Sequence, residues 1–466
     1  MNATRSAALA ELTALLGDEV VKAPDADALA RHTRDYGVQG SVDVGVLALV
    51  YPRTTAEVSA LLRYCHEHRV AVQPQGGMTG LSGGGVPAGP CVILAMERMR
   101  VIRELDTAAA TITVEAGVVL ERIQQAAAAA DFFFPLDLGA RGSCQIGGNL
   151  STNAGGNRVL RFGMARELTL GVEAVLADGT VIDALGKVTK NNTGYDLRQL
   201  FIGSEGTLGV ITAAVLRLFP RARSLCTGMF ALDSYADVLT LLNRVRTSFG
   251  PQLTAFEVMW PAFYLLGTTR LGRRPPVALA EGIGVLVETM GFDTVSDPER
   301  FEQVLGAALQ DGLIVDAAIA QSERETSELW AVRDSPAEWR QAGHWPQLSF
   351  DVSVPTGEIG KLVAEIDTAL SRHWRDLQVL YFGHVADGNL HVSVNMAADP
   401  APQHEIEAVV YEVVAQRRGS ISAEHGIGSL KVPFLELSRS AAEVALMRAI
   451  KKTLDPRNIL NPGKIF

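Results

Sequence analysis

The sequence predicts a soluble protein of mixed helices and strands that folds as two or three domains. A chain of 466 residues is longer than one typical hydrophobic core accommodates. A hydrophobic content of 47% with 20% charged residues is typical of globular proteins rather than disordered ones. Glycine clusters stop near the middle of the chain, and residues from about 225 to 420 alternate helical and strand patterns without them. This change of pattern marks the start of a second domain.

Local patterns predict the individual elements in chain order. Apolar residues at helical or strand spacing predict helices at residues 7–16, 55–67, 119–131 and 441–454, and strands at residues 70–73, 92–95, 111–114, 168–176 and 180–183. Asp178-Gly179, between the last two strands, is a hairpin turn signal.

Charge, cysteine content and hydropathy argue against several classes of protein. The net charge of −10 and the lack of a basic patch with interleaved aromatic residues argue against nucleic-acid binding. The four cysteines have no C-x-x-C spacing, so neither a zinc ribbon nor a disulfide framework is indicated. The first twenty residues lack the continuous apolar core of a signal peptide, and no stretch approaches a membrane helix. We therefore expect a cytoplasmic protein without a transmembrane segment.

Three segments rich in glycine predict a binding site for a large anionic ligand. They span Gly76–Gly85, Gly147–Asn157 and Phe201–Ile211. Backbone amides in such loops form anion-binding nests, and glycine allows close approach to a phosphate. The first segment lacks both the Lys-Ser/Thr ending of a nucleotide-hydrolysing loop and the Rossmann pattern. A single loop is as easily a cluster of turns, but three of them favour an elongated ligand such as a dinucleotide.

Histidines in the second half predict a metal site. Asp387-Gly388 between two strand-like runs predicts a two-residue type I′ hairpin, which would place His384 directly opposite His391. Opposed residues have Cβ atoms about 4.5–5.5 Å apart, which suits two imidazoles sharing one cation. Glu424 can add an oxygen ligand and leave positions open for catalysis, with His425 as a base beside the metal. Hydrogen-bonded strand histidines and an ordinary Glu-His pair are the alternative.

Seven segments in order resemble one known family. The chain is similar over nearly its whole length to the FAD-linked oxidases of the vanillyl-alcohol-oxidase fold. Within that family it looks closest to the branch of D-lactate dehydrogenase, D-2-hydroxyglutarate dehydrogenase and the glycolate oxidase catalytic subunit. The matching segments are Gln75–Gly85, Gly147–Gly156, Asn192–Leu197, Phe201–Thr212, Gly383–His391, Ser422–Gly428 and Leu460–Lys464.

The resemblance implies an α+β fold with noncovalent FAD. It implies a two-subdomain FAD-binding domain over residues 1–220, an α+β cap domain with an antiparallel sheet over 221–425, and a helical segment over 426–466 that returns to the FAD-binding domain. The residues that would bind FAD are Gln75, Gly76, Gly77, Met78, Thr79, Gly80, Leu81, Ser82, Gly148, Asn149, Ser151, Thr152, Asn153, Gly155, Gly203, Glu205, Gly206, Leu208 and Ile211. An exposed turn carboxylate is the alternative for Glu205.

The resemblance also implies a role for each residue of the catalytic site. His384, His391 and Glu424 would hold a divalent cation, zinc or manganese, and His425 would be the base. Arg333 matches the arginine that binds the substrate carboxylate in relatives; a solvated helix arginine is its alternative.

Two further residues are open to either interpretation. Tyr195 and Lys190 are candidate pocket neighbours, and equally a core tyrosine and a surface lysine.

The expected activity is FAD- and metal-dependent oxidation of a D-2-hydroxy acid to the 2-oxo acid. As aligned with the resembling D-2-hydroxyglutarate enzymes, this chain has Ser349 in place of a lysine and Ser393 in place of an asparagine. Losing those groups favours a short or apolar substrate, such as D-lactate, over a diacid. Arg340 or His344 can compensate, so D-2-hydroxyglutarate stays as the second candidate.

Other classes and the partners stay open at this point. A flavoprotein of this fold without net alcohol oxidation, like the ether-lipid synthase relatives, and a flavin-binding subunit of a larger complex are the alternatives. The electron acceptor can be an electron-transfer flavoprotein, a quinone or a cytochrome. A homodimer is the default expectation for a soluble enzyme.

Overall fold

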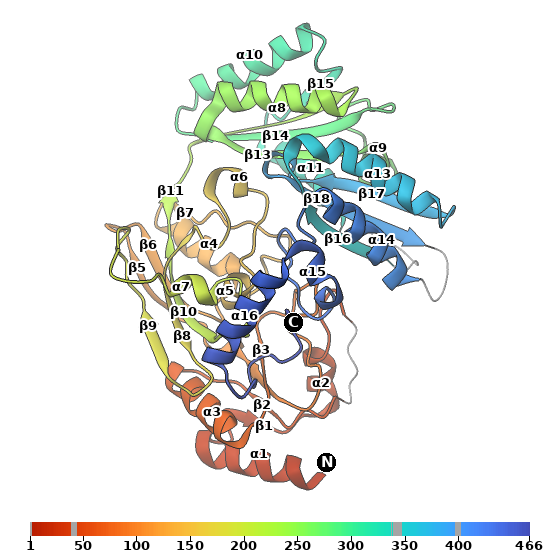
Figure 1. Cartoon of the computed structure of the whole chain (residues 1–466). Helices are drawn as coiled ribbons and strands as arrows, with labels where there is room; N and C mark the ends of the chain where they lie inside the picture. The colour runs from red at the N-terminus through yellow and green to blue at the C-terminus, as the bar shows by residue number, and fades with distance from the viewer. Residues whose placement is uncertain (1, 39–43, 337, 339–346, 397–401) are drawn as a thin grey trace. The chain divides into compact units, whose positions relative to one another are not determined.

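The computed structural model describes residues 2–38, 44–336, 338, 347–396 and 402–466. The chain divides into two units, which the coloured ribbon of Figure 1 allows the reader to follow. The first unit comprises Met1–Gly156, Gly163–Arg221 and Glu424–Phe466, and the second comprises Asn157–Phe162 and Ala222–Ala423. The last segment of the chain thus belongs to the same unit as the first.

The first unit is built on sheets with short helices around them. Its strands are β1 (Val21–Lys22), β2 (Ala48–Val50), β3 (Val72–Gln75), β4 (Val92–Ala95), β5 (Ile102–Asp106), β6 (Thr111–Glu115), β7 (Phe132–Phe133), β8 (Thr169–Val175), β9 (Val181–Ala184), β10 (Val210–Arg217) and β11 (Phe219–Pro220). Its helices are α1 (Asn2–Leu16), α2 (Ala26–His32), α3 (Thr55–His68), α4 (Leu120–Ala129), α5 (Ile146–Ser151), α7 (Arg198–Phe201), α15 (Leu435–Ser438) and α16 (Ala441–Leu454).

Strand pairing divides this unit into two larger sheets. In the described residues one sheet has the order β1-β2-β4-β3, in which β2, β4 and β3 run parallel. The other has the order β5-β6-β10-β8-β9 and is antiparallel throughout. β8 and β9 form the hairpin predicted around Asp178-Gly179, with Val175 opposite Val181 and Gly179 at φ +84°. This turn is therefore confirmed.

Helix α3 shows how the sequence specifies a start, a stop and a buried side. Thr54 and Glu57 form a capping box at its beginning, which satisfies backbone N–H groups that have no partner within the helix. Arg69 ends the helix in the left-handed conformation. Leu61 and Leu62 are fully buried against the first sheet. The helix thereby positions β3, the strand that leads into the first glycine-rich segment.

The second unit carries one large antiparallel sheet. Its strands are β12 (Ser224–Leu232), β13 (Leu253–Met259), β14 (Ile283–Gly291), β15 (Asp316–Ile319), β16 (Gln347–Ser353), β17 (Leu377–Gly383) and β18 (Asn389–Met396), and its helices are α6 (Val159–Phe162), α8 (Tyr235–Phe249), α9 (Pro261–Gly267), α10 (Ser296–Gln310), α11 (Glu323–Arg333), α13 (Ile359–Ser371) and α14 (Gln403–Gln416). In the described residues the strand order is β15-β12-β14-β13-β17-β18-β16.

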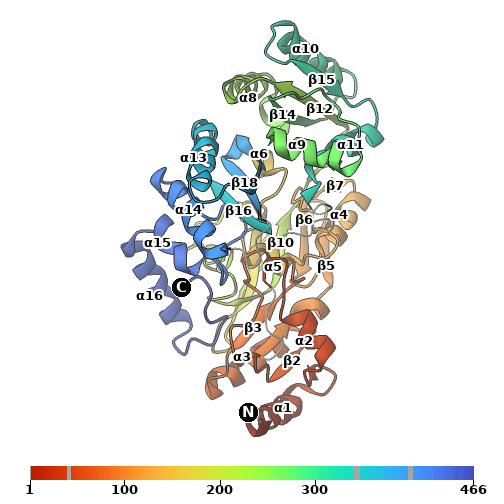
Figure 2. The same ribbon diagram turned by 90° about the vertical axis from the view of Figure 1, so that its right-hand side faces the viewer.

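Helices cover both faces of this sheet. Phe263 of α9 and Leu329 and Val332 of α11 pack in one hydrophobic cluster with Met229 of β12. Phe230, the next residue of β12, points to the opposite face and contacts Phe301 of α10. Figure 2 shows the same arrangement, with α8 and α10 on one side of β12 and β14 and α9 and α11 on the other. The face under α9 and α11 is the one that carries the candidate catalytic residues.

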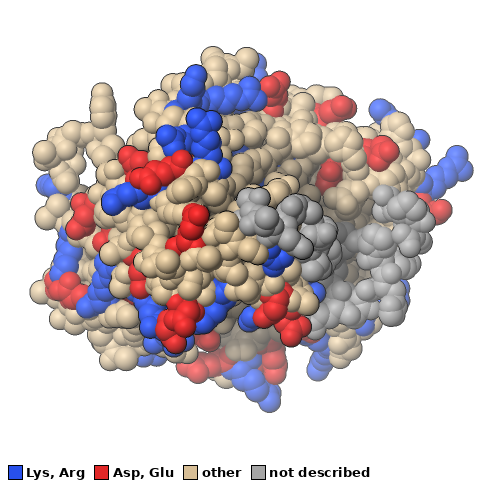
Figure 3. All heavy atoms as spheres, turned by 90° about the horizontal axis from the view of Figure 1, so that it is seen from below, with Lys and Arg blue, Asp and Glu red and all other residues tan. Residues whose placement is uncertain are grey.

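The α+β fold predicted from the sequence is confirmed, as are most of its elements. The helix at 441–454 and the strand at 92–95 have the predicted bounds, and the strand predicted at 70–73 lies two residues further on. No helix of the described residues combines the length and the apolar character needed to cross a lipid bilayer. On the face drawn in Figure 3, acidic and basic side chains are intermixed.

Candidate active site

The three glycine-rich segments meet in the first unit. The first begins where β3 ends, and a Cβ built on Gly76 would lie 3.6 Å from the Cα atom of Gly148 in the second. The backbone N–H of Gly203 in the third segment donates to the carbonyl of Leu150 at 2.9 Å. The N–H of Glu205 donates to the carbonyl of Ser151 at 2.7 Å. The three segments, far apart in the sequence, therefore lie together in the first unit, and we call this region the glycine-rich lining.

Close approach of other atoms limits the residue at two of these positions. A Cβ on Gly77 would lie 2.1 Å from the carbonyl oxygen of Ser143, and a Cβ on Gly155 would lie 2.2 Å from Oε1 of Glu424. Both separations are too short for non-bonded carbon and oxygen atoms. Position 77 therefore requires glycine, because the clash is with backbone, whereas a larger residue at position 155 would require the Glu424 side chain to move. The N–H of Gly156 also donates to Oε1 of Glu424 at 2.7 Å.

Several predicted cofactor residues use their side chains to brace the loops. Nε2 of Gln75 donates to the carbonyls of His32 and Gly85, each at 2.7 Å. The hydroxyl of Ser151 donates back to the carbonyl of Gly147 at 2.7 Å. Oδ1 of Asn153 accepts the N–H of Arg166 at 2.9 Å. These side-chain hydrogen bonds stabilise the conformation of the loops.

Glu205 also has a structural partner. It is 8% exposed, so the reading of an exposed turn carboxylate is wrong. Its carboxylate accepts the N–H groups of Ile427 and Gly428 at 2.8 and 2.7 Å. Burial raises the pKa of Glu205, and the two backbone hydrogen bonds oppose that rise. Glu205 therefore joins the third glycine-rich segment to the returning C-terminal segment.

Unpartnered polar atoms test whether this lining fits a cofactor. Buried polar groups are normally hydrogen-bonded, yet several buried side-chain atoms in the described residues of the first unit have no hydrogen-bond partner, and six of these lie in or near the glycine-rich segments. They are Oδ2 of Asp35, Oγ of Ser82, Oε1 of Gln145, Oδ1 of Asn149, Oδ1 of Asn461 and Nζ of Lys464. Burial lowers the pKa of Lys464, and the charges of the nearby Glu205 and Asp35 carboxylates oppose that shift. Donors and acceptors of this kind beside glycine-rich loops fit FAD.

The predicted two-residue hairpin at Asp387-Gly388 is wrong. β17 and β18 pair with Phe382 opposite His391, so His384 lies past the end of the strand instead of opposite His391. Val385–Asp387 form a 3-10 turn and only Gly388, at φ +91°, has the positive φ that a type I′ turn needs at both positions. The register differs from the prediction by two residues, which keeps every side chain on its face. The two imidazole centroids still lie 5.3 Å apart.

His384 and Arg333 share one carboxylate, that of Glu257 in β13. Nδ1 of His384 lies 2.6 Å from Oε1 of Glu257, and Nε of Arg333 donates to Oε2 at 2.8 Å. Nη2 of Arg333 lies 3.1 Å from Nε2 of His384, which closes a ring of three side chains. All three are at most 8% exposed. The interpretation of Arg333 as a solvated helix arginine is therefore wrong.

Sequence reasoning missed Glu257, although a signal was present. It is the one carboxylate in the apolar strand Leu253–Met259, and an acidic residue in a buried strand is rare unless it is paired. Burial raises the pKa of Glu257, but the adjacent His384 and Arg333 outweigh that effect and lower the pKa overall. Glu257 is therefore ionised throughout the physiological pH range.

The same sheet face continues from His391 along β16 and β18. Asp351, fully buried, is the register partner of His391 and accepts a hydrogen bond from Nδ2 of Asn389 at 3.1 Å. Ser349 lies directly opposite Ser393, two pairs further along the strands and therefore on the same face. The two positions singled out for substrate choice are thus neighbours.

Other predicted residues fall in different places. Glu424 and His425 begin the segment that returns to the first unit, immediately after Ala423, whose N–H donates to the carbonyl of Asp351 at 3.2 Å. Tyr195 is 95% exposed, so it is not a core tyrosine, and Lys190 is also exposed.

Arg340 and His344 lie outside the described residues. Their predicted role as compensating partners for a diacid therefore stays a prediction.

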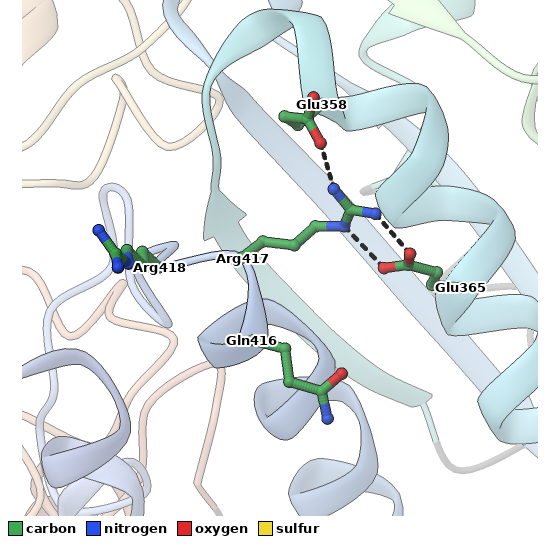
Figure 4. A pocket seen from close by; sticks show the side chains of 5 residues that line it. All are labelled: Glu358, Glu365, Gln416, Arg417 and Arg418. Carbon is green, nitrogen blue, oxygen red and sulfur yellow. Dashed lines mark hydrogen bonds and ion pairs between the residues drawn. The ribbon is translucent and has the colours of Figure 1, made fainter.

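A surface hollow of the second unit contains none of the predicted site residues. It is lined by Glu358, Glu365, Gln416, Arg417 and Arg418. Figure 4 shows the guanidinium of Arg417 held between the two carboxylates, with Nε donating to Glu365 at 2.6 Å. These ion pairs join the end of α14 to α13.

Comparison with known proteins identifies the family. Residues 221–465 match the model of the C-terminal domain of FAD linked oxidases, and residues 46–185 match an FAD binding domain. The chain belongs to the FAD-linked oxidases. This family assignment confirms the predicted resemblance and the use of FAD.

Relatives in this family agree with the predicted enzyme class. A mitochondrial D-2-hydroxyglutarate dehydrogenase of Arabidopsis thaliana is 41% identical over 421 residues, which cover 90% of this chain and 74% of that protein. A D-2-hydroxyglutarate dehydrogenase of Stutzerimonas stutzeri is 35% identical over 95% of both chains. The prediction of an FAD-dependent dehydrogenase of D-2-hydroxy acids is therefore confirmed at the level of the class.

A solved structure supports the fold. The 4-ethylphenol oxidase of Gulosibacter chungangensis superposes with a TM-score of 0.77 over 99% of this chain and 97% of its own, at 20% identity. This likeness concerns the fold alone.

Proposed function

We propose that this FAD-linked oxidase oxidises a short or apolar D-2-hydroxy acid, of the D-lactate type, to the 2-oxo acid with the help of a divalent cation. The observation that carries the proposal is the ring of Glu257, Arg333 and His384. The ring contains two groups with complementary tasks. The guanidinium of Arg333 can bind a carboxylate, and the imidazole of His384 can bind a metal.

Three residues of this chain are proposed to hold the cation. His384, at the end of β17, and His391 in β18 would supply nitrogen ligands, and their imidazole centroids lie 5.3 Å apart. Glu424 would supply an oxygen ligand, and it follows Ala423, whose N–H donates to the carbonyl of Asp351, the register partner of His391. Two imidazoles and a carboxylate suit zinc or manganese. A cation held in this way supplies Lewis acidity that lowers the pKa of the substrate hydroxyl.

The protein residues then divide the remaining tasks. Arg333 binds the substrate carboxylate and fixes the orientation of the substrate. His425 accepts the hydroxyl proton on its imidazole, because histidine is the side chain that most often serves as a general base. The chemistry that FAD supplies is acceptance of the hydride from the substrate carbon. The proton and the hydride together account for the two hydrogens that an alcohol loses on oxidation.

The pair of Ser349 and Ser393 supports a substrate without a distal charge. Two neutral hydroxyl side chains on the sheet face beyond His391 offer no cation to a second carboxylate. The names of the relatives favour the second candidate, D-2-hydroxyglutarate.

Anaerobic mixing with a panel of substrates tests the proposal. D-lactate and other short D-2-hydroxy acids should bleach the flavin absorbance band, whereas the L-isomers should not. Faster bleaching by D-2-hydroxyglutarate than by every short acid would replace the first candidate with the second. An unchanged flavin band with all D-2-hydroxy acids would contradict the proposed oxidation.

The proposal also includes an electron acceptor, an oligomeric state and a cellular location. Electron-transfer flavoprotein, quinone and cytochrome remain the proposed classes of electron acceptor, and the homodimer remains the default assembly. A cytoplasmic location is proposed from the sequence, whereas the relative from Arabidopsis thaliana is named mitochondrial.

A further inference from the structure

Glu257 is placed to control both partners of its carboxylate at once. It is 1% exposed and lies on the sheet face that α11 covers, with one oxygen on Nδ1 of His384 and the other on Nε of Arg333. The guanidinium carbon of Arg333 also lies 5.3 Å from the ring centroid of Phe382, which limits its freedom to move away. Both partners are therefore fixed by contacts within one unit.

The hydrogen atoms of this ring follow from its heavy atoms. An arginine side chain only donates hydrogen bonds and keeps its proton in proteins. Because Nη2 of Arg333 lies 3.1 Å from Nε2 of His384, Nε2 must be the acceptor and must carry a lone pair. Nδ1 then carries the proton and donates it to Glu257 at 2.6 Å. This tautomer presents the nitrogen that a metal would use.

A cation and Arg333 cannot use that nitrogen together. The hydrogen atom that Nη2 donates points at the lone pair of Nε2, and a cation bound to that nitrogen would need the same lone pair. Two positive groups so close would also repel each other strongly in a buried site. Nη2 must therefore leave Nε2 when a cation binds, although the bond from Nε to Glu257 can persist.

We propose that Glu257 is a positioning residue that sets the metal-binding tautomer of His384, and that Arg333 occupies the lone pair of His384 until a cation displaces it. The displaced Nη2 then becomes available to the substrate carboxylate. The cation thus prepares the carboxylate site as well as the hydroxyl site. This inference rests on the proposed function, because it needs His384 to be a metal ligand.

Metal affinity of the full-length, FAD-loaded protein tests this inference without measuring turnover. The affinity for Zn²⁺ and for Mn²⁺ is measured by competition with a chromophoric chelator. Glu257→Gln should weaken binding about 10- to 100-fold, because partners of ligating histidines have effects of this size. Arg333→Met should tighten binding about tenfold or more, because it removes the competing donor and its charge.

A matched pair in the first unit provides the control. Arg103 and Glu173 form a comparable partly buried ion pair at 3.3 Å. Glu173→Gln and Arg103→Met should leave metal affinity within about twofold of the wild type, a difference of about 0.4 kcal/mol.

The outcomes separate this inference from the proposed function. Unchanged affinity in Glu257→Gln would remove its positioning role. Unchanged or weaker affinity in Arg333→Met, which does not depend on the folding of the first variant, would remove the competition. Absence of divalent-cation binding by the wild type would contradict the proposed metal site itself.

Discussion

The glycine-rich lining of the first unit and the Glu257–Arg333–His384 ring of the second differ in whether their polar side chains already have hydrogen-bond partners within the protein. The lining leaves buried polar atoms without partners, among them Oδ1 of Asn149 and Nζ of Lys464. In the ring, each of the three side chains is hydrogen-bonded to the other two. A ligand in the glycine-rich lining can therefore add hydrogen bonds to groups that have none, whereas a ligand at the ring must replace a hydrogen bond that already exists within the protein.

This difference has an energetic consequence. An unsatisfied buried polar group costs about 1–3 kcal/mol, so a ligand that pairs with such groups recovers that cost. In the ring, a cation must instead replace the hydrogen bond between Arg333 and His384. We therefore expect cofactor binding in the first unit to be robust to changes in the second, and the following variants test that independence.

The largest expected effect is that of His384→Ala. It should reduce turnover by about 10³-fold, corresponding to about 4 kcal/mol of transition-state stabilisation, and leave the FAD content unchanged. Steady-state kinetics and the flavin absorbance of the purified protein measure the two quantities. His373→Ala, at an exposed histidine of the same unit, is the control. Loss of FAD together with activity would show that the two regions are not independent.

Gly148→Ala should have the converse effect. A Cβ on Gly148 meets no atom of the chain within 4 Å, so the protein itself has space for a methyl group at this position. The methyl group would clash only with a cofactor bound against this glycine. We expect FAD affinity to fall roughly tenfold or more, about 1.4 kcal/mol, with no loss of thermal stability of the apoprotein. Gly186→Ala, which also has open space, should leave both unchanged. Normal FAD affinity in Gly148→Ala would move the cofactor away from this segment.

Ser349→Lys should change substrate choice without changing the cofactor. A lysine opposite Ser393 would offer a cation to a second carboxylate, so the ratio of kcat/KM for D-2-hydroxyglutarate to that for D-lactate should rise about tenfold, or about 1.4 kcal/mol. Ser371→Lys, at the exposed end of α13, is the control. An unchanged ratio would remove this pair of serines from the substrate site.

The smallest effect concerns the pH dependence of the first unit. Burial lowers the pKa of His32 below its ordinary value of about 6.5, and its Nδ1 donates to Oε1 of Gln75 at 2.6 Å. The unfolded chain therefore binds this proton more readily, and stability is lost as the pH falls below about 6.5. Urea unfolding at pH 7 and pH 5.5 should show a smaller loss for His32→Gln than for the wild type. Equal losses would show that His32 is not responsible.

Patterns along the chain predict the elements well where local signals are strong. The capping box of α3, the turn at Gly179 and the three glycine-rich segments are all readable from adjacent residues. The contacts between those segments are not, because the N–H of Gly203 and the carbonyl of Leu150 meet only through the tertiary fold.

The errors in the predicted site also arise because tertiary contacts cannot be predicted from adjacent residues. Asp387-Gly388 favours a tight turn locally, but the pairing of β17 with β18 and the burial of Val385 select a longer turn. The imidazoles of His384 and His391 nevertheless lie with their centroids 5.3 Å apart, because a register change of two residues preserves the alternation of side chains. Glu257 is distant in sequence from both of its partners, and no spacing rule connects them.

Anaerobic stopped-flow mixing before and after metal removal tests the central claim most directly. The FAD-loaded protein is mixed with D-lactate and with L-lactate, and flavin absorbance is followed. We predict rapid bleaching with D-lactate alone, loss of that bleaching after chelation with FAD still bound, and recovery on addition of Zn²⁺ or Mn²⁺. Bleaching by D-lactate at an unchanged rate in the fully chelated protein would contradict the account.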